Sequence, residues 1–374
     1  MNVLYIFGFQ YSLKLWKKTG ALEREFKFFE KLSEVENIKF TLVTYGDLRD
    51  IHVFDKDNVS VIPIFSIFKK TNSKILTFIF SLMLPFKVRK NLKHIDLIKT
   101  NQLTGCWVGI LFKILLKKPL FLRTGYDAYL FSKKEKKNYF KKLFFYQLTK
   151  IALKTSDIYS VTSNSDYKFI SENYNFTKSK LIYRPNWVLQ KSDIKNVSSR
   201  TKNFLSVGRL EPQKNYPYLI QCLSNSGLNI DILGDGSEKE NLVKLANENN
   251  VNINFLRQIS YFELDQLFQN YKFFLLPSKF EGNPKVLLEA MSNGCIPIAS
   301  NISNHEEIII NGENGLLFSL NNSKNLPNII ESLNDEEYCN VLSKNAVESV
   351  TRKNSFDTSV TQEINDYREL TNLF

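Results

Sequence analysis

Short runs of apolar, often β-branched residues alternate along the chain with longer stretches in which apolar positions recur at helical spacing. The runs that predict strands in the first half are residues 2–9, 39–45, 59–65, 96–100, 120–124, 157–163 and 180–184. The stretches that predict helices lie near residues 20–34, 71–84, 103–116, 133–154 and 164–174. This alternation predicts a doubly wound parallel sheet, because each parallel strand needs a crossover before the next.

The second half repeats the alternation after a polar stretch without apolar periodicity, residues 190–202. Its predicted strands are residues 203–208, 228–234, 251–256, 272–277, 296–300 and 315–318, and its predicted helices lie near 215–224, 237–249, 261–269, 284–293 and 323–333. We therefore expect an α/β protein of two domains, residues 1–190 and 203–354, joined by a linker at 191–202. We expect a C-terminal helix at residues 355–374, and the N-terminal domain is a candidate packing partner for it. Ligands of such sheets bind beyond the carboxyl ends of the strands, so two facing domains would share a cleft.

Composition narrows the class of protein. The chain has 374 residues, of which 43% are hydrophobic and 24% charged, which indicates a globular protein and excludes a disordered one. The four cysteines have no zinc or disulfide spacing and the start lacks a signal-peptide pattern, so we expect a cytoplasmic location. Residues 1–200 carry 36 Lys and Arg against 16 Asp and Glu, a balance of +20, whereas the remainder has 14 against 22, a balance of −8. The basic half predicts an anionic partner: nucleic acid, a bilayer surface or a phosphorylated substrate.

The stretch FEGNPKVLLEAM, residues 280–291, places two glutamates eight positions apart. Asn283 suits a helix N-cap and Pro284 a first helical position, which puts Glu281 in the preceding loop and Glu289 about two turns into the helix. Gly282 lets a ligand approach the backbone. Two acids so placed could grip two parts of a long polar ligand. The alternative is a capped surface helix with a Lys285–Glu289 pair.

Two further loops follow predicted strands. SVGRLEPQKN, residues 206–215, brings Arg209 and Lys214 to the end of a strand, where a guanidinium and an ammonium suit a diphosphate. The alternative there is an ordinary basic loop. The turn at Gly234, in LGDG, opens the next helix and permits close approach of a ligand.

These motifs, in this order, form a known pattern: GRLEPQKN (208–215), LGDG (233–236), LLPSKFEGNPKVLLEAMSNGCIPIAS (275–300) and NGENGLLF (311–318). The chain resembles the GT4 family of nucleotide-sugar-dependent glycosyltransferases from about residue 203 to 320, and more loosely before it, where TGALEREF (19–26) resembles the family's glycine-rich loop. Glu281 and Glu289 match the family's pair of glutamates, E-x7-E. The resemblance implies the GT-B fold, with two Rossmann-like domains facing each other across a cleft, and retention of anomeric configuration.

The resemblance also implies roles for residues. Arg209 and Lys214 would hold the donor diphosphate and stabilise its departure, Glu281 would bind hydroxyls of the transferred sugar, and Glu289 would bind the ribose. The remaining donor-binding positions would be Gly20, Gly234, Gly282, Asn283, Pro284, Lys285 and Val286. No cofactor or metal is implied when cations stabilise the leaving group, and His52, His94 and His305 are too scattered to form a metal site.

One loop departs from the family pattern. Where many relatives have a histidine, this chain has RTGYDAYL, residues 123–130. Asp127 or Tyr126 would then orient the sugar or the acceptor, which makes Asp127 a candidate catalytic residue. The alternative is a turn closed by Gly125 and Asp127.

Two segments bear on a membrane. The apolar run 75–86 is too short to span a bilayer and is interrupted by Pro85, which favours a core helix over a membrane-dipping one. Residues 132–154 predict one helix with lysines crowded at its start and an apolar stripe, typical either of a basic helix at an anionic bilayer or of a core helix with a solvated lysine face. No nucleic-acid motif accompanies the charge, so we expect no nucleic-acid partner.

The predicted function is transfer of a hexosyl or N-acetylhexosaminyl group from a UDP- or GDP-linked sugar to a hydroxyl of a glycan or lipid-linked saccharide in cell-surface polysaccharide synthesis. The expected location is cytoplasmic, with peripheral binding to the inner face of the membrane. The alternative is a non-catalytic sugar-nucleotide-binding scaffold of a glycan-synthesis complex.

Overall fold

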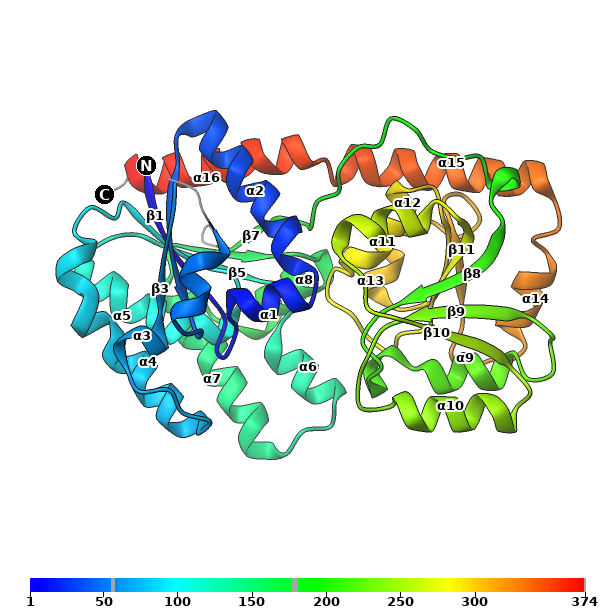
Figure 1. The fold of residues 1–374 in the computed structure, drawn as a ribbon, viewed down its shortest axis with the longest axis horizontal. Coiled ribbons are helices and arrows are strands. Elements are labelled where there is room, and N and C mark those ends of the chain that lie inside the picture. Colours follow the sequence, from blue (N-terminus) through cyan, green and yellow to red (C-terminus); the bar gives the residue numbers. More distant parts are fainter. Residues whose placement is uncertain (55–57, 177–180, 373–374) are drawn as a thin grey trace. The chain divides into compact units, whose positions relative to one another are not determined.

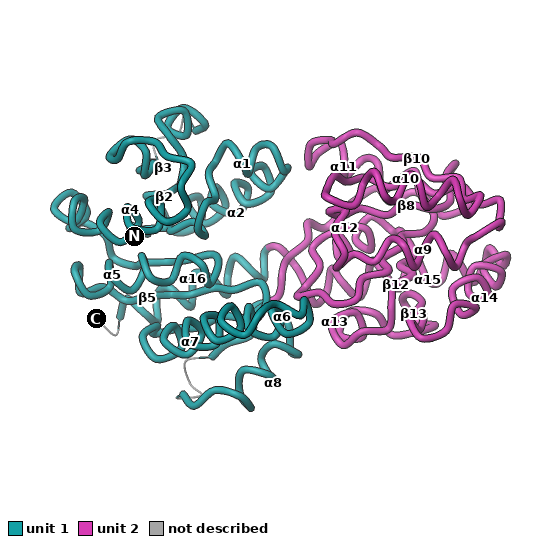
Figure 2. The backbone as a smooth tube through the Cα atoms, turned by 90° about the horizontal axis from the view of Figure 1, so that it is seen from below, with its two compact units in different colours: residues 1–184, 357–374 teal, residues 185–356 magenta. Residues whose placement is uncertain are grey.

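The computed structural model describes residues 1–54, 58–176 and 181–372 (Figure 1). The chain forms two compact units, coloured separately in Figure 2. Unit 1 comprises Met1–Arg184 with Asp357–Phe374, and unit 2 comprises Pro185–Phe356. The chain thus passes into unit 2 six residues before the expected end of the first domain, and its last helix belongs with unit 1.

Unit 1 is built on a seven-stranded parallel sheet. Its strands are β1 (Asn2–Ile6), β2 (Lys39–Thr44), β3 (Val59–Pro63), β4 (Leu97–Thr100), β5 (Leu120–Thr124), β6 (Ile158–Val161) and β7 (Leu181–Tyr183). In the sheet they lie in the order β3-β2-β1-β4-β5-β6-β7, so the chain winds outward from β1 to one edge and then from β4 to the other. Lys180, the first residue of the last predicted strand, lies outside the described residues.

Helices separate these strands along the chain. They are α1 (Leu13–Lys18), α2 (Ala21–Glu36), α3 (Ile64–Ile67), α4 (Lys74–Val88), α5 (Cys106–Leu116), α6 (Ala128–Lys134), α7 (Tyr139–Thr155), α8 (Asn164–Asn173) and the C-terminal α16 (Phe356–Asn372). Alternate residues of β1 face opposite layers: Leu4 and Ile6 pack in a core with α4 and α5, whereas the ring of Tyr5 contacts Phe29 of α2.

Unit 2 repeats the architecture with six parallel strands. They are β8 (Lys202–Val207), β9 (Asn229–Leu233), β10 (Asn252–Leu256), β11 (Tyr271–Leu276), β12 (Ile296–Ser300) and β13 (Leu316–Phe318). Their order, β10-β9-β8-β11-β12-β13, reverses direction between β8 and β11, which makes this the topological switch point of the sheet. Two doubly wound α/β sheets were predicted, and this prediction is confirmed.

The helices of unit 2 include one long helix that the sequence pattern did not predict, in addition to an unpredicted helix of four residues, Ser303–Glu306. They are α9 (Tyr216–Cys222), α10 (Lys239–Glu248), α11 (Tyr261–Phe268), α12 (Lys285–Ser292), α13 (Ser303–Glu306), α14 (Asn325–Glu331) and α15 (Glu336–Lys353). The long unpredicted helix is α15, which begins at the Asp335 side chain, an acceptor for the N–H of Tyr338, and packs against α12. Its buried positions are Cys339, Leu342, Ser343, Ala346 and Val350, so its inner side is apolar at helical spacing apart from Ser343, and the signal for this helix was present in the sequence.

Two other expectations need correction. The single helix predicted near 133–154 is two, α6 and α7, because Asn138 caps a new helix by accepting the N–H of Lys141 and Lys136 has a left-handed φ of 53°. Part of the expected linker is fixed to unit 2: the buried guanidinium of Arg200 donates to the carbonyl oxygens of Tyr271 and Asn293, both at 2.8 Å.

Helix α16 is bound to the rest of unit 1 by charged side chains. Arg184 and Asp366 form a two-bond ion pair at 2.9 and 2.6 Å, and the buried ammonium of Lys99 on β4 pairs with the buried carboxylate of Glu363. The hydroxyl of Tyr367 also donates to Glu363. Among the described residues, no helix is both long enough and apolar enough to cross a bilayer.

Candidate active site

The loops that follow β8 and β11 lie side by side at the switch point of unit 2 and are joined by backbone and side-chain hydrogen bonds. The N–H of Lys279 donates to the carbonyl oxygen of Gln213 at 2.9 Å, and the Gln213 amide donates to the carbonyl oxygen of Phe280 at 2.9 Å. Loops beyond the carboxyl ends of strands at such a point are where ligands of open α/β sheets bind.

These loops bring a cation and a carboxylate together. The ammonium of Lys214 lies 2.6 Å from Glu281 Oε1, which also accepts the Ser278 hydroxyl at 2.7 Å. The Gln213 amide lies 3.3 Å from the other carboxylate oxygen. Because Glu281 is buried, these donors fix the carboxylate in one orientation, which is the rigidity that a binding or catalytic group needs.

The charge of Glu281 is maintained by its partners. Burial alone would raise the pKa of this carboxyl, but the Lys214 ammonium and the Ser278 hydroxyl outweigh burial and hold the pKa below its usual value. The pair is therefore an ammonium facing a carboxylate at neutral pH. Such a pair can present a hydrogen-bond acceptor to sugar hydroxyls and a donor to an anionic group.

His305 of α13, which the sequence analysis considered only as a metal ligand, lies close enough to this pair to interact electrostatically with both of its members. Its Nδ1–H donates to the carbonyl oxygen of Ser300 at 2.8 Å, and the Ser300 hydroxyl bonds the carbonyl oxygen of Ser278 at 2.5 Å. Burial lowers the pKa of His305 to about 4, against the opposing charge of Glu281. The imidazole is therefore neutral, and Nε2 finds no hydrogen-bond partner within the ranges that the structure describes.

Arg209 lies in the loop after β8, where the backbone packs closely against the loop after β9. The N–H of Gly208 bonds the carbonyl oxygen of Leu233, and a Cβ on Gly234 would lie 1.9 Å from the carbonyl oxygen of Gly208. The close approach expected at Gly234 is thus made by this chain's own backbone. The Arg209 side chain is exposed, and it forms no ion pair in the part of the chain that the structure covers, which leaves its guanidinium available for an anionic ligand.

The start of α12 differs from the expected cap. Pro284 occupies the N-cap position and Lys285 is the first helical residue, so the predictions of Asn283 as N-cap and Pro284 as first helical residue are wrong. The Asn283 side chain instead accepts the N–H of Asn186 at 3.1 Å, and its carbonyl oxygen accepts the Asn186 amide at 2.8 Å. Asn283 therefore anchors the Glu281–Gly282 loop to the segment that enters unit 2.

Glu289 lies within α12, and its side chain is buried. Residues 287–292 of this helix are all buried, so the alternative of a surface helix is wrong. At the exposed end, Lys285 points into solvent and Val286 is half-buried.

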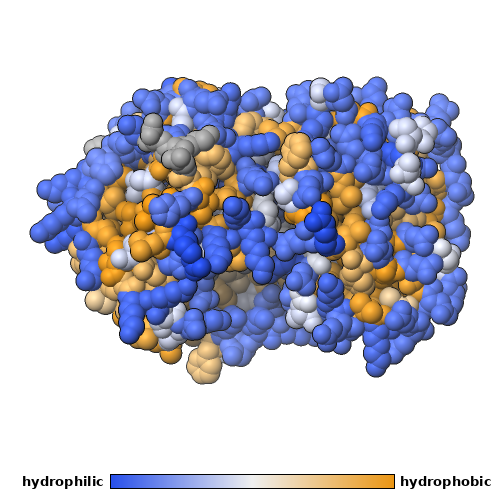
Figure 3. All heavy atoms as spheres, viewed as in Figure 1, coloured by the Kyte–Doolittle hydropathy of each residue, from blue (hydrophilic) through white to orange (hydrophobic). Residues whose placement is uncertain are grey.

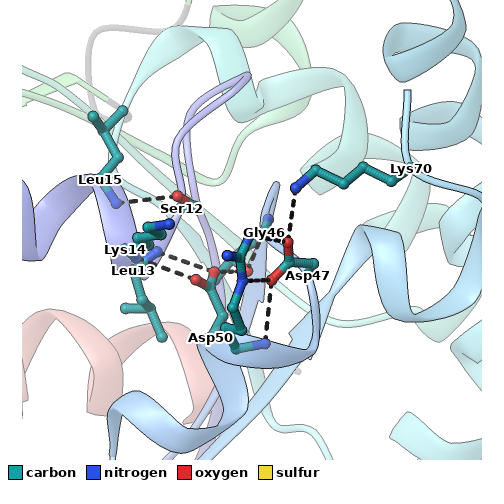
Figure 4. Close-up of polar contacts among 10 residues, drawn as sticks. Ser12, Leu13, Lys14, Leu15, Gly46, Asp47, Asp50 and Lys70 are labelled. Carbon is teal, nitrogen blue, oxygen red and sulfur yellow. Dashed lines mark hydrogen bonds and ion pairs between the residues drawn. The ribbon is translucent and has the colours of Figure 1, made fainter. Parts of the chain in front are cut away.

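In unit 1, Gly20 has a φ of 73° and is the N-cap of α2, a left-handed conformation that disfavours any other residue. The short helix α1 that leads to it is held by a buried carboxylate, as Figure 4 shows. Asp50 accepts the N–H groups of Leu13 and Lys14 at 3.0 and 3.1 Å and the Thr44 hydroxyl at 2.7 Å. Asp50, which the sequence analysis did not single out, thus fixes the segment before Gly20.

Asp127 is wholly buried at the start of α6. Its Oδ1 accepts the N–H of Leu130 at 2.6 Å, and its own N–H donates to Asp166 at 3.2 Å. Its Oδ2 meets no hydrogen-bond partner among the described residues. Burial, with the charge of Asp166 adding to it, raises the pKa of Asp127 to about 7.

We expect Asp127→Asn to make unit 1 less sensitive to pH. The folded state holds the Asp127 proton up to about pH 7, whereas the unfolded chain loses it near pH 4, so this group's contribution to stability falls as pH rises between those values. Asparagine keeps the cap and carries no charge. We compare the free energy of unfolding of the variant with that of wild type at each pH. From pH 4.5 to pH 8 this difference should change by about 1–3 kcal/mol in favour of the variant. Urea unfolding at both pH values measures this difference, and an unchanged difference would refute it.

Sequence reasoning missed several members of the site, namely Gln213, Ser278 and His305. Gln213 and Ser278 stand beside predicted residues, one and three positions from Lys214 and Glu281, and their position in the same loops was the available signal. His305 follows a different strand, and nothing in its local sequence indicated burial beside Glu281.

The family model described as Glycosyl transferases group 1 matches residues 190–349 of the chain. An uncharacterised glycosyltransferase of Methanocaldococcus jannaschii is 31% identical over 294 residues, which cover 76% of this chain and 79% of that protein. A UDP-Gal:alpha-D-GlcNAc-diphosphoundecaprenol alpha-1,3-galactosyltransferase of Escherichia coli is 32% identical over 38% of this chain and 39% of its own length.

A solved structure of Anabaena HepE in complex with UDP and glucose superposes with a TM-score of 0.75 at 17% identity. The superposition covers 99% of this chain and all of that one. The likeness extends over both α/β units, so it concerns the fold of the whole chain.

Proposed function

Because the chain belongs to the group 1 glycosyltransferases, the GT4 family, and has the GT-B fold, we propose that it transfers a hexosyl or N-acetylhexosaminyl group from a UDP- or GDP-linked sugar. The acceptor in this proposal is a hydroxyl of a glycan or lipid-linked saccharide, in cell-surface polysaccharide synthesis, with retention at the anomeric carbon. UDP is favoured over GDP because UDP stands in the names of two of the similar proteins, the galactosyltransferase and the HepE complex.

The observation that carries the proposal is the Lys214–Glu281 pair at the switch point of unit 2. Glu281 would accept hydroxyls of the transferred sugar. An ammonium has three donors, so Lys214 can keep its bond to Glu281 and still donate to the donor diphosphate. The exposed guanidinium of Arg209 would donate two hydrogen bonds to other oxygens of the diphosphate.

Rupture of the anomeric C–O bond leaves negative charge on the nucleoside diphosphate. Lys214 and Arg209, already placed at β8, would stabilise that charge as it develops, which is the form of electrostatic help that lowers a barrier most. Backbone N–H groups between Gly282 and Val286 would bind further oxygens, apart from Pro284, which has no N–H, and Glu289 would bind the ribose. Gly20 would let the backbone come close to the donor. Gly234 would serve donor binding by letting its loop pack against Gly208, next to Arg209, and Asp127 would position the loop at Tyr126.

A membrane surface is the proposed site of action. The exposed apolar residues of α7 are Tyr139, Phe140, Leu143, Phe144 and Ile151. Phe140 is 79% exposed, which favours the bilayer alternative for this stripe over the core-helix one. Six lysines lie at the end of α6, in the connection to α7 and in the first turn of α7: Lys133, Lys134, Lys136, Lys137, Lys141 and Lys142. Both features support peripheral binding to an anionic bilayer on the cytoplasmic side.

Thermal unfolding in the presence of candidate donors tests the proposal. A ligand that binds only the folded state stabilises it by about 2.7 kcal/mol at a hundredfold excess over Kd, so UDP and a UDP-sugar should raise the melting temperature by several degrees. Uridine, which lacks the diphosphate, is the matched control and should raise it little. Turnover of the responding donor on lipid-linked acceptors then separates an enzyme from a scaffold. No response to any nucleotide sugar, or binding with no turnover, would refute the enzyme proposed here.

A further inference from the structure

Helix α4 exposes a row of apolar side chains, and its buried side combines two hydroxyl residues with Leu84, Pro85 and Val88. Thr77 and Ser81 are buried, whereas Ile75, Ile79 and Phe86 on the opposite side lie in solvent, Ile75 with 74% of its surface exposed. Leu76 and Met83 widen this exposed row. The row recurs at helical spacing, so it forms one continuous stripe. The helix was expected to be a core helix, and its orientation does not match that expectation.

The inward hydroxyls are bonded, which explains why this orientation is stable. Ser81 accepts the indole N–H of Trp107 on α5 at 3.0 Å and donates to the carbonyl oxygen of Phe78 at 2.6 Å. Thr77 donates to the carbonyl oxygen of Ser73 at 2.8 Å. Leu84 and Val88 complete the contact with the core of unit 1. If the helix turned its apolar stripe inward, it would form no new hydrogen bond, and it would lose the bond between Ser81 and Trp107.

The sequence segment that contains the stripe is basic and lacks acids. From residue 58 to 95 the sequence has no Asp or Glu, while it has seven basic residues: Lys69, Lys70, Lys74, Lys87, Arg89, Lys90 and Lys93. Lys70 pairs with Asp47, and Lys87 lies over the ring of Phe68 at 5.5 Å. Figure 3 shows apolar atoms over the region where Figure 1 places α3 and α4, with hydrophilic atoms among them.

We propose that α4 is an interfacial helix whose stripe, Ile75, Leu76, Ile79, Met83 and Phe86, inserts into the headgroup boundary of an anionic lipid bilayer. Charge complementarity selects this occupant: basic residues flank an apolar row at both ends, as they do on helices that lie in a bilayer surface. Neighbouring α5 adds the exposed Ile114, and α5 packs against both α4 and α7. The inserted helix and the basic α7 therefore belong to one helical layer of unit 1. The insertion itself does not depend on the proposed function. Only its biological purpose, access to a lipid-linked acceptor, rests on that function.

Co-sedimentation of the full chain with vesicles tests the insertion. Vesicles of phosphatidylcholine with 30% phosphatidylglycerol should bind the protein, and pure phosphatidylcholine should bind it far less. Raising NaCl from 0.1 to 0.5 M weakens the electrostatic contribution to vesicle binding, because the Debye length falls. It leaves the contribution of the apolar stripe in place. Ile79→Glu should lower the partition coefficient at least tenfold at both salt concentrations, because it puts a carboxylate into the inserted stripe.

The matched control is Val243→Glu on α10 of unit 2, whose side chain is 42% exposed, as is that of Ile79. This variant should bind as wild type does. An Ile79→Trp variant should show a blue shift of its emission with the anionic vesicles. Turnover of the donor on a water-soluble acceptor should be equal in wild type and Ile79→Glu, so loss of vesicle binding is distinguishable from failure of the proposed enzyme. Wild-type binding by Ile79→Glu would overturn the inference, as would a concentration-dependent dimer abolished by the same substitution.

Discussion

Lys214→Ala is expected to lower kcat/KM for the nucleotide sugar by about 10²–10³-fold, the loss usual when one preorganised donor to a developing negative charge is removed. The substitution deletes the ammonium that faces Glu281 at 2.6 Å and, in our proposal, the donor diphosphate. It also leaves the buried Glu281 carboxylate without its counter-charge. Steady-state kinetics with the donor identified by thermal unfolding measures the loss.

Two variants make this result specific. Lys244→Ala removes a lysine that forms an exposed ion pair with Glu248 on α10 and should leave kcat/KM unchanged. Glu281→Gln should lower activity comparably to Lys214→Ala, and the double variant should lose less than the two single losses combined, because the residues act as a pair. Additive losses would show that the two residues do not act as a pair, and full activity in Lys214→Ala would show that its ammonium has no role in the reaction.

Glu363→Ala is expected to lower the free energy of unfolding of unit 1 by about 3–5 kcal/mol. Lys99 is buried among the rings of Tyr5, Phe121 and Tyr367, and Glu363 is its carboxylate partner across β4 and α16. The substitution would leave the buried Lys99 ammonium without the carboxylate that contacts it. The hydroxyl of Tyr367 would lose its acceptor as well.

Glu369→Ala, an exposed position on the same helix, is the control and should change stability by no more than about 0.5 kcal/mol. Hydrogen exchange of β4 and β5 identifies the unit that loosens. Faster exchange there in Glu363→Ala alone would support a structural role of the C-terminal helix in the N-terminal domain. Equal behaviour of the two variants would mean that α16 contributes nothing through this pair.

The strands were predictable because a parallel strand buried on both faces is a continuous apolar run, and the residues of β1 and β12 have that form. Helix α15 was missed although its buried positions Cys339, Leu342, Ala346 and Val350 recur at helical spacing. For α4 the less favoured of two predictions, a membrane-dipping helix, is the one that agrees with its exposed apolar row, because pattern reading assumes that apolar positions face inward.

Those residues of the candidate site that come shortly after a predicted strand were predictable from the sequence. Arg209, Lys214 and Glu281 were each placed by position in their loops, and the structure adds that Lys214 and Glu281 touch although 67 residues separate them. The supporting groups were not predictable from local sequence. Ser278 and His305 act through contacts between three strand ends, and only the sheet order β8-β11-β12 brings those ends together.

The most direct test of the central claim is a crystal structure of the protein with the nucleotide sugar that stabilises it. The account predicts diphosphate oxygens within about 3 Å of Lys214 Nζ and of the Arg209 guanidinium, and a sugar hydroxyl at the same distance from Glu281. A nucleotide bound away from the loops after β8 and β11 would contradict the account.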